Sequence, residues 1–210
     1  MNAVLDAVHG GMVHTRRVAR LGSLIADRIP RNATVLDVGT GDGRLAARIH
    51  GLRPDLAISG VDVLERPHTA VAVQLFDGTH LPFGNASFDA VTCVDVLHHA
   101  VDASQLLREC ARVARQVVII KDHLREGFLA AGTLRFMDWV GNARHGVLLP
   151  YNYLSRREWR GLIETAGADV QGWEERLDLY PPPFSWLFGR QLHVLMTLRP
   201  HPRAATARRE

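Results

Sequence analysis

Residues 35–46 read VLDVGTGDGRLA, and this stretch decides the fold. An apolar run that carries one acid, Asp37, leads into a turn with three glycines and a second acid, Asp42, and a helical pattern follows. A strand that runs through a glycine-rich turn into a helix brings free backbone N–H groups close to a ligand. The stretch therefore predicts a ligand-binding unit of an α/β sheet.

The alternation of strands and helices continues along the chain. Apolar strand patterns lie at 33–39, 56–63, 69–78, 88–97 and 116–122, and helical patterns lie at 12–29, 42–52 and 103–115. Strands that are apolar throughout and alternate with helices predict a parallel sheet that is covered by helices on both faces.

The C-terminal half predicts a different ending for the sheet. One helix is expected at 126–143, and another, at 155–167, opens with a Ser-x-x-Glu capping box and closes with a glycine. Strand patterns at 168–177 and 190–200 are joined by a proline-rich bend. We therefore expect the sheet to end in an antiparallel pair.

Composition indicates a globular protein. The chain has 210 residues, of which 47% are hydrophobic and 22% are charged, enough to bury the core of one domain. Its two cysteines, Cys93 and Cys110, form no CxxC pair, so neither a disulfide framework nor a metal site is predicted. No run is long enough to span a membrane, and the first residues lack a secretory pattern, so we expect a cytoplasmic protein.

The glycine turn matches the dinucleotide fingerprint G-x-G-x-x-G only in part. Gly39 and Gly41 fit, but Arg44 takes the place of the third glycine. Asp37 and Asp42 oppose the binding of a pyrophosphate, because like charges repel strongly in a cleft of low dielectric constant. They suit a ligand that carries an amine or a sulfonium, so an NAD-dependent oxidoreductase is the weaker alternative.

Two further acids end the next strands. Asp62 ends the second strand, where a carboxylate binds both ribose hydroxyls of an adenosine, and Val63 beside it is placed to pack on an adenine face. Asp77, followed by Gly78, ends the third strand, where a carboxylate accepts from the adenine amino group. Each acid alone has an equally good structural explanation, but the set at this spacing predicts an adenosine site.

Taken together, VLDVGTGDGRLA, GVDV, LFDGTHLPFGNASFDAVTCVDVLHH and the helix and strand that follow resemble the class I S-adenosylmethionine-dependent methyltransferases. Among these, the chain is most similar to the bacterial type 11 group, which includes the quinone and menaquinone methyltransferases. The resemblance covers roughly residues 33–122. It implies a Rossmann-like, seven-stranded, mostly parallel sheet with a reversed last strand and helices on both faces, and S-adenosylmethionine as the cofactor.

The resemblance also assigns cofactor contacts. Asp37 and the glycine turn would hold the methionine moiety, Asp62 the ribose, and Asp77 with Gly78 the adenine. The cofactor-binding residues that it implies are Asp37, Gly39, Thr40, Gly41, Gly43, Asp62, Val63, Asp77, Gly78, Val94 and Asp95. One departure concerns the short connection from Asp62 to the third strand. The usual helix there is expected to be missing, which leaves one side of the adenine pocket open.

Histidines and aromatic residues are the candidates for the acceptor side, because ligands bind beyond the carboxyl ends of parallel strands. A histidine there can take a proton from an acceptor hydroxyl, although it can equally be a satisfied core side chain. The predicted catalytic residues are His98 and His99, and the predicted substrate residues are Lys121, Trp139, Asn142, His145, Tyr151 and Tyr153.

The predicted domain spans residues 1–200. Within it, residues 1–30 are expected to form an N-terminal helix or lid, residues 126–165 the helices and loop on the acceptor side, and residues 201–210 a disordered tail. Residues 9–17 hold His14, Arg16 and Arg17, and an arginine there could pair with the carboxylate of the methionine moiety or simply lie in solvent at the helix start.

These patterns predict an S-adenosylmethionine-dependent methyltransferase that acts on a small, partly hydrophobic acceptor by direct in-line methyl transfer. We expect no metal and no integral membrane segment. We also expect no nucleic-acid partner, because the sequence has no basic segment with interleaved aromatic residues. A non-catalytic protein that binds S-adenosylmethionine or a nucleotide is the alternative. The sequence does not identify the acceptor, the methylated atom or the oligomeric state.

Overall fold

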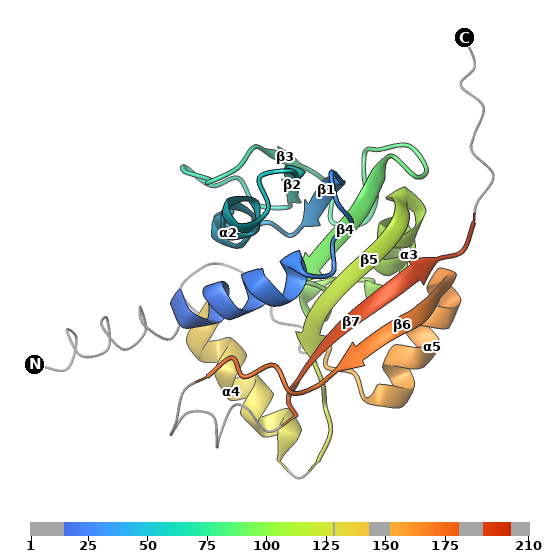
Figure 1. The fold of residues 1–210 in the computed structure, drawn as a ribbon. Helices are drawn as coiled ribbons and strands as arrows, with labels where there is room; N and C mark the ends of the chain where they lie inside the picture. Colours follow the sequence, from blue (N-terminus) through green and yellow to red (C-terminus); the bar gives the residue numbers. More distant parts are fainter. Residues whose placement is uncertain (1–14, 128, 143–151, 181–190, 203–210) are drawn as a thin grey trace, which may run out of the picture.

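Seven strands form one sheet in the computed structural model, in the order β3-β2-β1-β4-β5-β7-β6 (Figure 1). The structure describes residues 15–127, 129–142, 152–180 and 191–202, and of residues 137–142 only the backbone. The strands are β1 (Thr34–Val38), β2 (Ala57–Asp62), β3 (Val73–Leu75), β4 (Phe88–Val94), β5 (Ala114–His123), β6 (Ala168–Glu174) and β7 (His193–Pro200). Strands β1 to β5 pair in parallel, and β7 runs antiparallel to both β5 and β6. The predicted mostly parallel sheet with a reversed last strand is confirmed.

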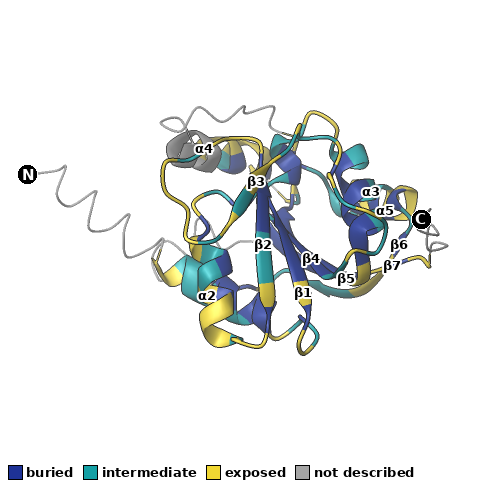
Figure 2. Ribbon diagram, turned by 90° about the horizontal axis from the view of Figure 1, so that it is seen from above, coloured by how far each residue is buried: buried dark blue, intermediate teal, exposed yellow. Residues whose placement is uncertain are grey.

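Helices cover both faces of the sheet, as predicted. The helix at 15–26 and α2 (Arg44–Leu52) pack on one face, and α3 (Ala103–Val113) and α5 (Arg156–Ala166) pack on the other (Figure 1). Helix α4 (Ala130–Asn142) lies beyond the carboxyl ends of the central strands (Figure 1). The central strands β1, β4 and β5 are buried between these layers (Figure 2).

Local sequence signals fix the helix ends. The predicted capping box of α5 is present, since Ser155 and Glu158 each bond the other's backbone N–H, and Gly167 closes the helix at φ 75°. Asp102 caps α3 by accepting from the N–H of Gln105 at 2.8 Å. Trp159 anchors α5 to the sheet: it is buried, and its indole N–H donates to the carbonyl of His123. Burial of such a side chain contributes about 2–3 kcal/mol.

The connection between β2 and β3 contains no helix, as expected. Strand β3, however, has three residues, so the prediction of a strand over 69–78 is wrong in extent. The chain before β3 is held against the glycine turn instead, because the N–H of Ala70 donates to the carbonyl of Asp42 at 2.9 Å. Figure 2 shows β3 and this connection at the exposed edge of the sheet.

Both cysteines are buried free thiols. Across the residues that the structure describes, none of the helices has the length and apolar character that a membrane span requires.

Candidate functional site

In the glycine turn after β1, one glycine is packed tightly against a neighbouring side chain and another is open to a ligand. Gly39 has φ 72°, and a side chain there would overlap Val96. Gly41 has φ 62°, and apart from its own neighbours in the chain no described residue has an atom within 4 Å of the point where its Cβ would be. The first glycine lets the turn pack on the chain after β4, and the second leaves room for a ligand to approach the backbone.

Asp37 lies under this turn as a buried carboxylate. It is 5% exposed and accepts a hydrogen bond from the hydroxyl of Thr92, its neighbour on β4, at 2.6 Å. Burial raises the pKa of Asp37 to about 6, against the lowering effect of the Thr92 bond. The negative charge of Asp62 raises the pKa further. A cation bound here would favour the ionised carboxylate.

Asp62, at the end of β2, holds the same turn from the other side. Its carboxylate oxygens accept from the N–H of Gly41 at 2.7 Å and from the N–H of Leu64 at 2.9 Å, and the residue is buried. An ionised carboxylate offers about four acceptor positions, so two stay available for ligand hydroxyls. Asp62 can therefore orient the turn and bind the two hydroxyls of a diol at the same time.

The next predicted contacts border an open surface. Val63 is 54% exposed and lies against Gly78, whose Cβ position is 3.1 Å from the Val63 side chain. Asp77 accepts from the N–H groups of His80 and Thr79 at 2.6 and 2.7 Å, and these bonds lower its pKa. The ends of β2 and β3 thus bring an apolar side chain and a carboxylate together, and the connection between the two strands contributes no helix to cover them.

Asp95, directly after β4, has a backbone conformation that is uncommon for residues other than glycine. Its φ is 56°, in the left-handed region, and its N–H donates to the carbonyl of Lys121 at 2.8 Å. Its carboxylate forms ion pairs with Arg17 from the N-terminal helix and with Lys121. Burial alone would raise the pKa of Asp95, but Arg17 and Lys121 outweigh it and hold the pKa well below its ordinary value.

Lys121 and Asp122 end β5 on opposite faces of the sheet. Lys121 is fully buried against Asp95, and its pKa is lowered by burial while Asp95 opposes that shift. Asp122 is equally buried and lies 2.5 Å from Nδ1 of His98; it also accepts from the N–H groups of Leu97 and His123. The two residues therefore have separate partners and are not a Lys–Asp pair.

His98 is oriented by this carboxylate. Burial would raise the pKa of Asp122, but the neighbouring His98 lowers it, so the group is a carboxylate and accepts the Nδ1 proton. In the neutral ring the lone pair is then on Nε2, which is the arrangement of a general base held by an acid. His99 lies against His98, with ring centroids 3.9 Å apart.

The predicted acceptor residues are only partly described. Tyr153 is buried beside His98 and His123, at ring distances of 5.8 and 5.7 Å. Trp139 and Asn142 lie in the part of α4 for which only the backbone is described. The remaining two, His145 and Tyr151, lie outside the described residues.

Sequence reasoning missed His193, the first residue of β7. It pairs with His123 across β5 and β7, with ring centroids 5.1 Å apart, and it is buried. In the sequence it appears inside an apolar run and looks like a core residue. Only the strand register, which no local pattern gives, brings it beside the strand ends.

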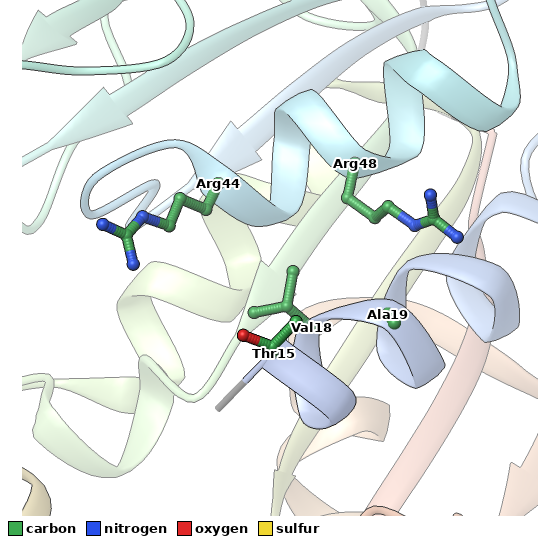
Figure 3. Close-up of a pocket in the computed structure, with 5 residues that line it drawn as sticks. All are labelled: Thr15, Val18, Ala19, Arg44 and Arg48. Carbon is green, nitrogen blue, oxygen red and sulfur yellow. The ribbon is translucent and has the colours of Figure 1, made fainter. Parts of the chain in front are cut away.

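A groove of about 350 Å³ lies between the N-terminal helix and α2, away from these acids. Figure 3 shows Thr15, Val18 and Ala19 on one side and Arg44 and Arg48 on the other. None of its lining residues is a carboxylate or a histidine, so the strand ends and not this groove carry the chemistry described above.

Comparisons with known proteins find methyltransferases among the similar sequences and structures. Residues 36–120 match the family model Methyltransf_11, described as a methyltransferase domain. The chain is 32% identical over 111 residues to the 27-O-demethylrifamycin SV methyltransferase of Amycolatopsis mediterranei, covering 46% of this chain and 40% of that protein. It is 30% identical over 143 residues to the demethylmenaquinone methyltransferase of Thermotoga maritima, covering 58% and 60%.

The fold extends further than the sequence similarity. A putative methyltransferase of Haloferax volcanii, solved in complex with the Trm112 methyltransferase activator, superposes with a TM-score of 0.64 at 18% identity and covers 94% of this chain and 96% of that chain. The chain spans less than two thirds of the length of the curated relatives described above.

Proposed function

We propose that the protein is an S-adenosylmethionine-dependent methyltransferase, because residues 36–120 match the model of the Methyltransf_11 methyltransferase domain, for which S-adenosylmethionine is the implied cofactor. The proposed acceptor is a small, partly hydrophobic molecule, and the proposed reaction is direct in-line methyl transfer. S-adenosylmethionine supplies the electrophilic methyl group on its sulfonium.

The observation that carries this proposal is the buried Asp37 beneath an open glycine turn. A buried carboxylate favours a cationic group, and the methionine moiety of the cofactor carries an ammonium. The space beside Gly41 admits that moiety to the backbone. Asp62 is suited to the ribose hydroxyls, and Asp77 with Val63 to the adenine.

On the acceptor side, His98 is the proposed general base and Asp122 its positioning residue. The Asp122 carboxylate fixes the proton on Nδ1, so Nε2 can take the proton of an acceptor hydroxyl. Burial of this pair excludes water from the base. The proposed acceptor contacts are Lys121, Trp139, Asn142, His145, Tyr151 and Tyr153. His99 is proposed to pack against the base.

Thermal unfolding with S-adenosylmethionine, S-adenosylhomocysteine and NAD(H) tests the cofactor assignment. A ligand at a hundred times its Kd stabilises the folded state by about 2.7 kcal/mol. For a domain of this size, that corresponds to roughly 5–10 °C. We expect this shift with the two sulfur compounds and none with NAD(H); a shift with NAD(H) alone would show that the acidic turn binds a dinucleotide.

Replacement of Asp62 tests the ribose assignment. We expect Asp62→Asn to weaken S-adenosylhomocysteine binding about tenfold or more, the loss of charge-assisted hydrogen bonds worth ~1.5–3 kcal/mol. Asparagine can still accept from the N–H of Gly41 but has no second oxygen for the N–H of Leu64, so the melting temperature of the variant is measured as well. Calorimetric titration measures the affinity, with Asp169→Asn, an exposed acid on β6, as the control. Equal affinity in Asp62→Asn and the unchanged protein would contradict the ribose role.

Turnover separates an enzyme from a protein that only binds the cofactor. We propose to incubate the full chain with S-adenosylmethionine labelled in the methyl group and a panel of phenols, quinols, amines and carboxylates, and to detect labelled products by mass spectrometry. Cofactor binding without any labelled product would favour the non-catalytic alternative.

A further inference from the structure

A row of aromatic rings lies beyond the ends of β4 and β5 and at the start of β7. Successive ring centroids are 3.9, 4.6, 5.1 and 5.6 Å apart. The row consists of His99, His98, His123, His193 and Tyr180, and Tyr153 packs beside its middle. Aromatic rings of this kind attract a planar ligand by stacking, and His99 and Tyr180, at the two ends of the row, are its partly exposed members.

The strand register places polar side chains of the sheet on the same face as this row. His123 pairs with His193 across β5 and β7, so both side chains lie on one face, and Lys121, two residues before His123, shares it. Val94 is opposite Lys121, and Thr92 with Asp37 continue the same face toward the glycine turn. The proposed cofactor acid and the histidine row therefore lie along one face of the sheet.

His193 is the least satisfied member of the row. It is 3% exposed, and neither of its ring nitrogens has a hydrogen-bond partner among the residues that the structure describes. A buried imidazole without partners destabilises the fold, because its donor and its acceptor have both lost water. Burial, together with the charges of Lys121 and His123, lowers its pKa well below the ordinary value, so the ring is neutral and offers one donor and one acceptor.

Among the residues that the structure describes, two cations near His193 depend on one carboxylate. Arg17 and Lys121 share the single carboxylate of Asp95. The nearby Asp122 is on the opposite face and is bound to His98, so it does not compensate. The Arg17 side chain is 25% exposed, whereas Lys121 is fully buried, and a buried cation that shares its counter-ion is unfavourable unless a further anion pairs with it. An ammonium ligand would increase the imbalance, whereas an ionised hydroxyl would remove it.

From the unpartnered His193, the surplus positive charge at Lys121 and the row of rings, and resting on the proposed methyltransferase function, we infer that the acceptor is an aromatic hydroxyl compound, a phenol, held through its oxygen by His193 and Lys121. The hydroxyl proton passes to His98. The oxygen then forms a bond to the methyl carbon as the bond from that carbon to sulfur breaks. The products are an aryl methyl ether and S-adenosylhomocysteine.

The test uses para-nitrophenol, whose visible absorption reports its ionisation, with the full chain saturated with S-adenosylhomocysteine so that no turnover occurs. We expect bound para-nitrophenol to be more ionised than the free compound at the same pH. The equally sized para-nitroaniline, which cannot supply an anion, is expected to bind about tenfold more weakly, the loss of a charge-assisted contact.

His193→Phe separates recognition from packing. We expect it to weaken para-nitrophenol binding about tenfold, to leave S-adenosylhomocysteine affinity unchanged, and to leave the melting temperature unchanged or raised, because two buried nitrogens without partners are removed. A purely structural histidine would instead lower the melting temperature without changing probe affinity. His201→Phe, beyond the far end of β7 and half exposed, is the matched control. It should leave para-nitrophenol binding and S-adenosylhomocysteine affinity unchanged.

The outcomes separate the two proposals. Normal binding of S-adenosylhomocysteine with no binding of para-nitrophenol, or with equal affinity for para-nitrophenol and para-nitroaniline, would overturn the phenol assignment and leave the cofactor assignment intact. Failure of S-adenosylhomocysteine to bind would overturn the proposed function, and the acceptor inference with it.

Discussion

Asp37→Asn is expected to make the ligand-free protein more stable and its S-adenosylmethionine binding about a hundredfold weaker or worse. Removing one partner of a buried charge pair costs about 2–5 kcal/mol of binding free energy. The same substitution removes a carboxylate whose pKa burial has raised from 3.8 to about 6. That shift corresponds to roughly 2–3 kcal/mol of folding free energy lost at neutral pH. Asparagine can still accept from Thr92.

The pH dependence follows from the direction of this shift. The folded protein binds the proton of Asp37 more tightly than the unfolded chain does, so Asp37 lowers stability as pH rises from about 4 to about 6. The stability gained in Asp37→Asn should therefore be full above pH 6 and vanish below pH 4. Cofactor affinity of the unchanged protein should fall as pH drops through about 6, because the carboxylate is then protonated.

Chemical denaturation across this pH range, paired with calorimetric titration, measures both effects. Asp89→Asn is the matched control, because the backbone N–H of Thr34 lowers the pKa of Asp89 to about 2. The same substitution there should reduce stability and leave cofactor affinity unchanged. A destabilised Asp37→Asn variant with normal affinity would mean that Asp37 serves only the turn.

His98→Asn is expected to reduce kcat by about 10²–10⁴-fold, the usual contribution of a general base. Asparagine can still donate to Asp122 from its amide, so the buried carboxylate keeps its partner, but it has no basic nitrogen. Cofactor affinity should not change. The rate is measured with an acceptor identified in the labelling screen.

The pH profile of kcat distinguishes a general base from a side chain that only fills space. With His98 present, kcat is expected to rise with pH through one ionisation, and this limb should disappear in His98→Asn. His50→Asn, on α2, changes a histidine away from the strand ends and should leave kcat and its profile as they are. An unchanged profile in His98→Asn would assign proton removal to another group.

Most of the fold could be predicted because its signals are local. Apolar strands, amphipathic helices and the capping box at Ser155 are each readable within a few residues, and the proline-rich connection indicated the antiparallel end. The extent of β3 was not predictable, because residues before it bond to the carbonyl of Asp42 in a turn distant in sequence.

The candidate site was predictable where the motif is contiguous and not where it depends on register. The acids at Asp37 and Asp62 follow apolar runs, so their place at the strand ends could be inferred. Lys121 and Asp122 are neighbours in the sequence, yet alternation along β5 puts them on opposite faces with different partners. His193 required the pairing of β5 with β7, which is a tertiary fact.

The short connection between β2 and β3 has a consequence for cofactor chemistry. The described connection between β2 and β3 places no helix over Val63 and Gly78, and Val63 is 54% exposed. With the adenine seated there as proposed, its outer edge faces solvent instead of protein. Substituents added to the purine would extend into water without a steric clash, so this chain is a natural starting scaffold for enzymes that accept enlarged synthetic methyl donors.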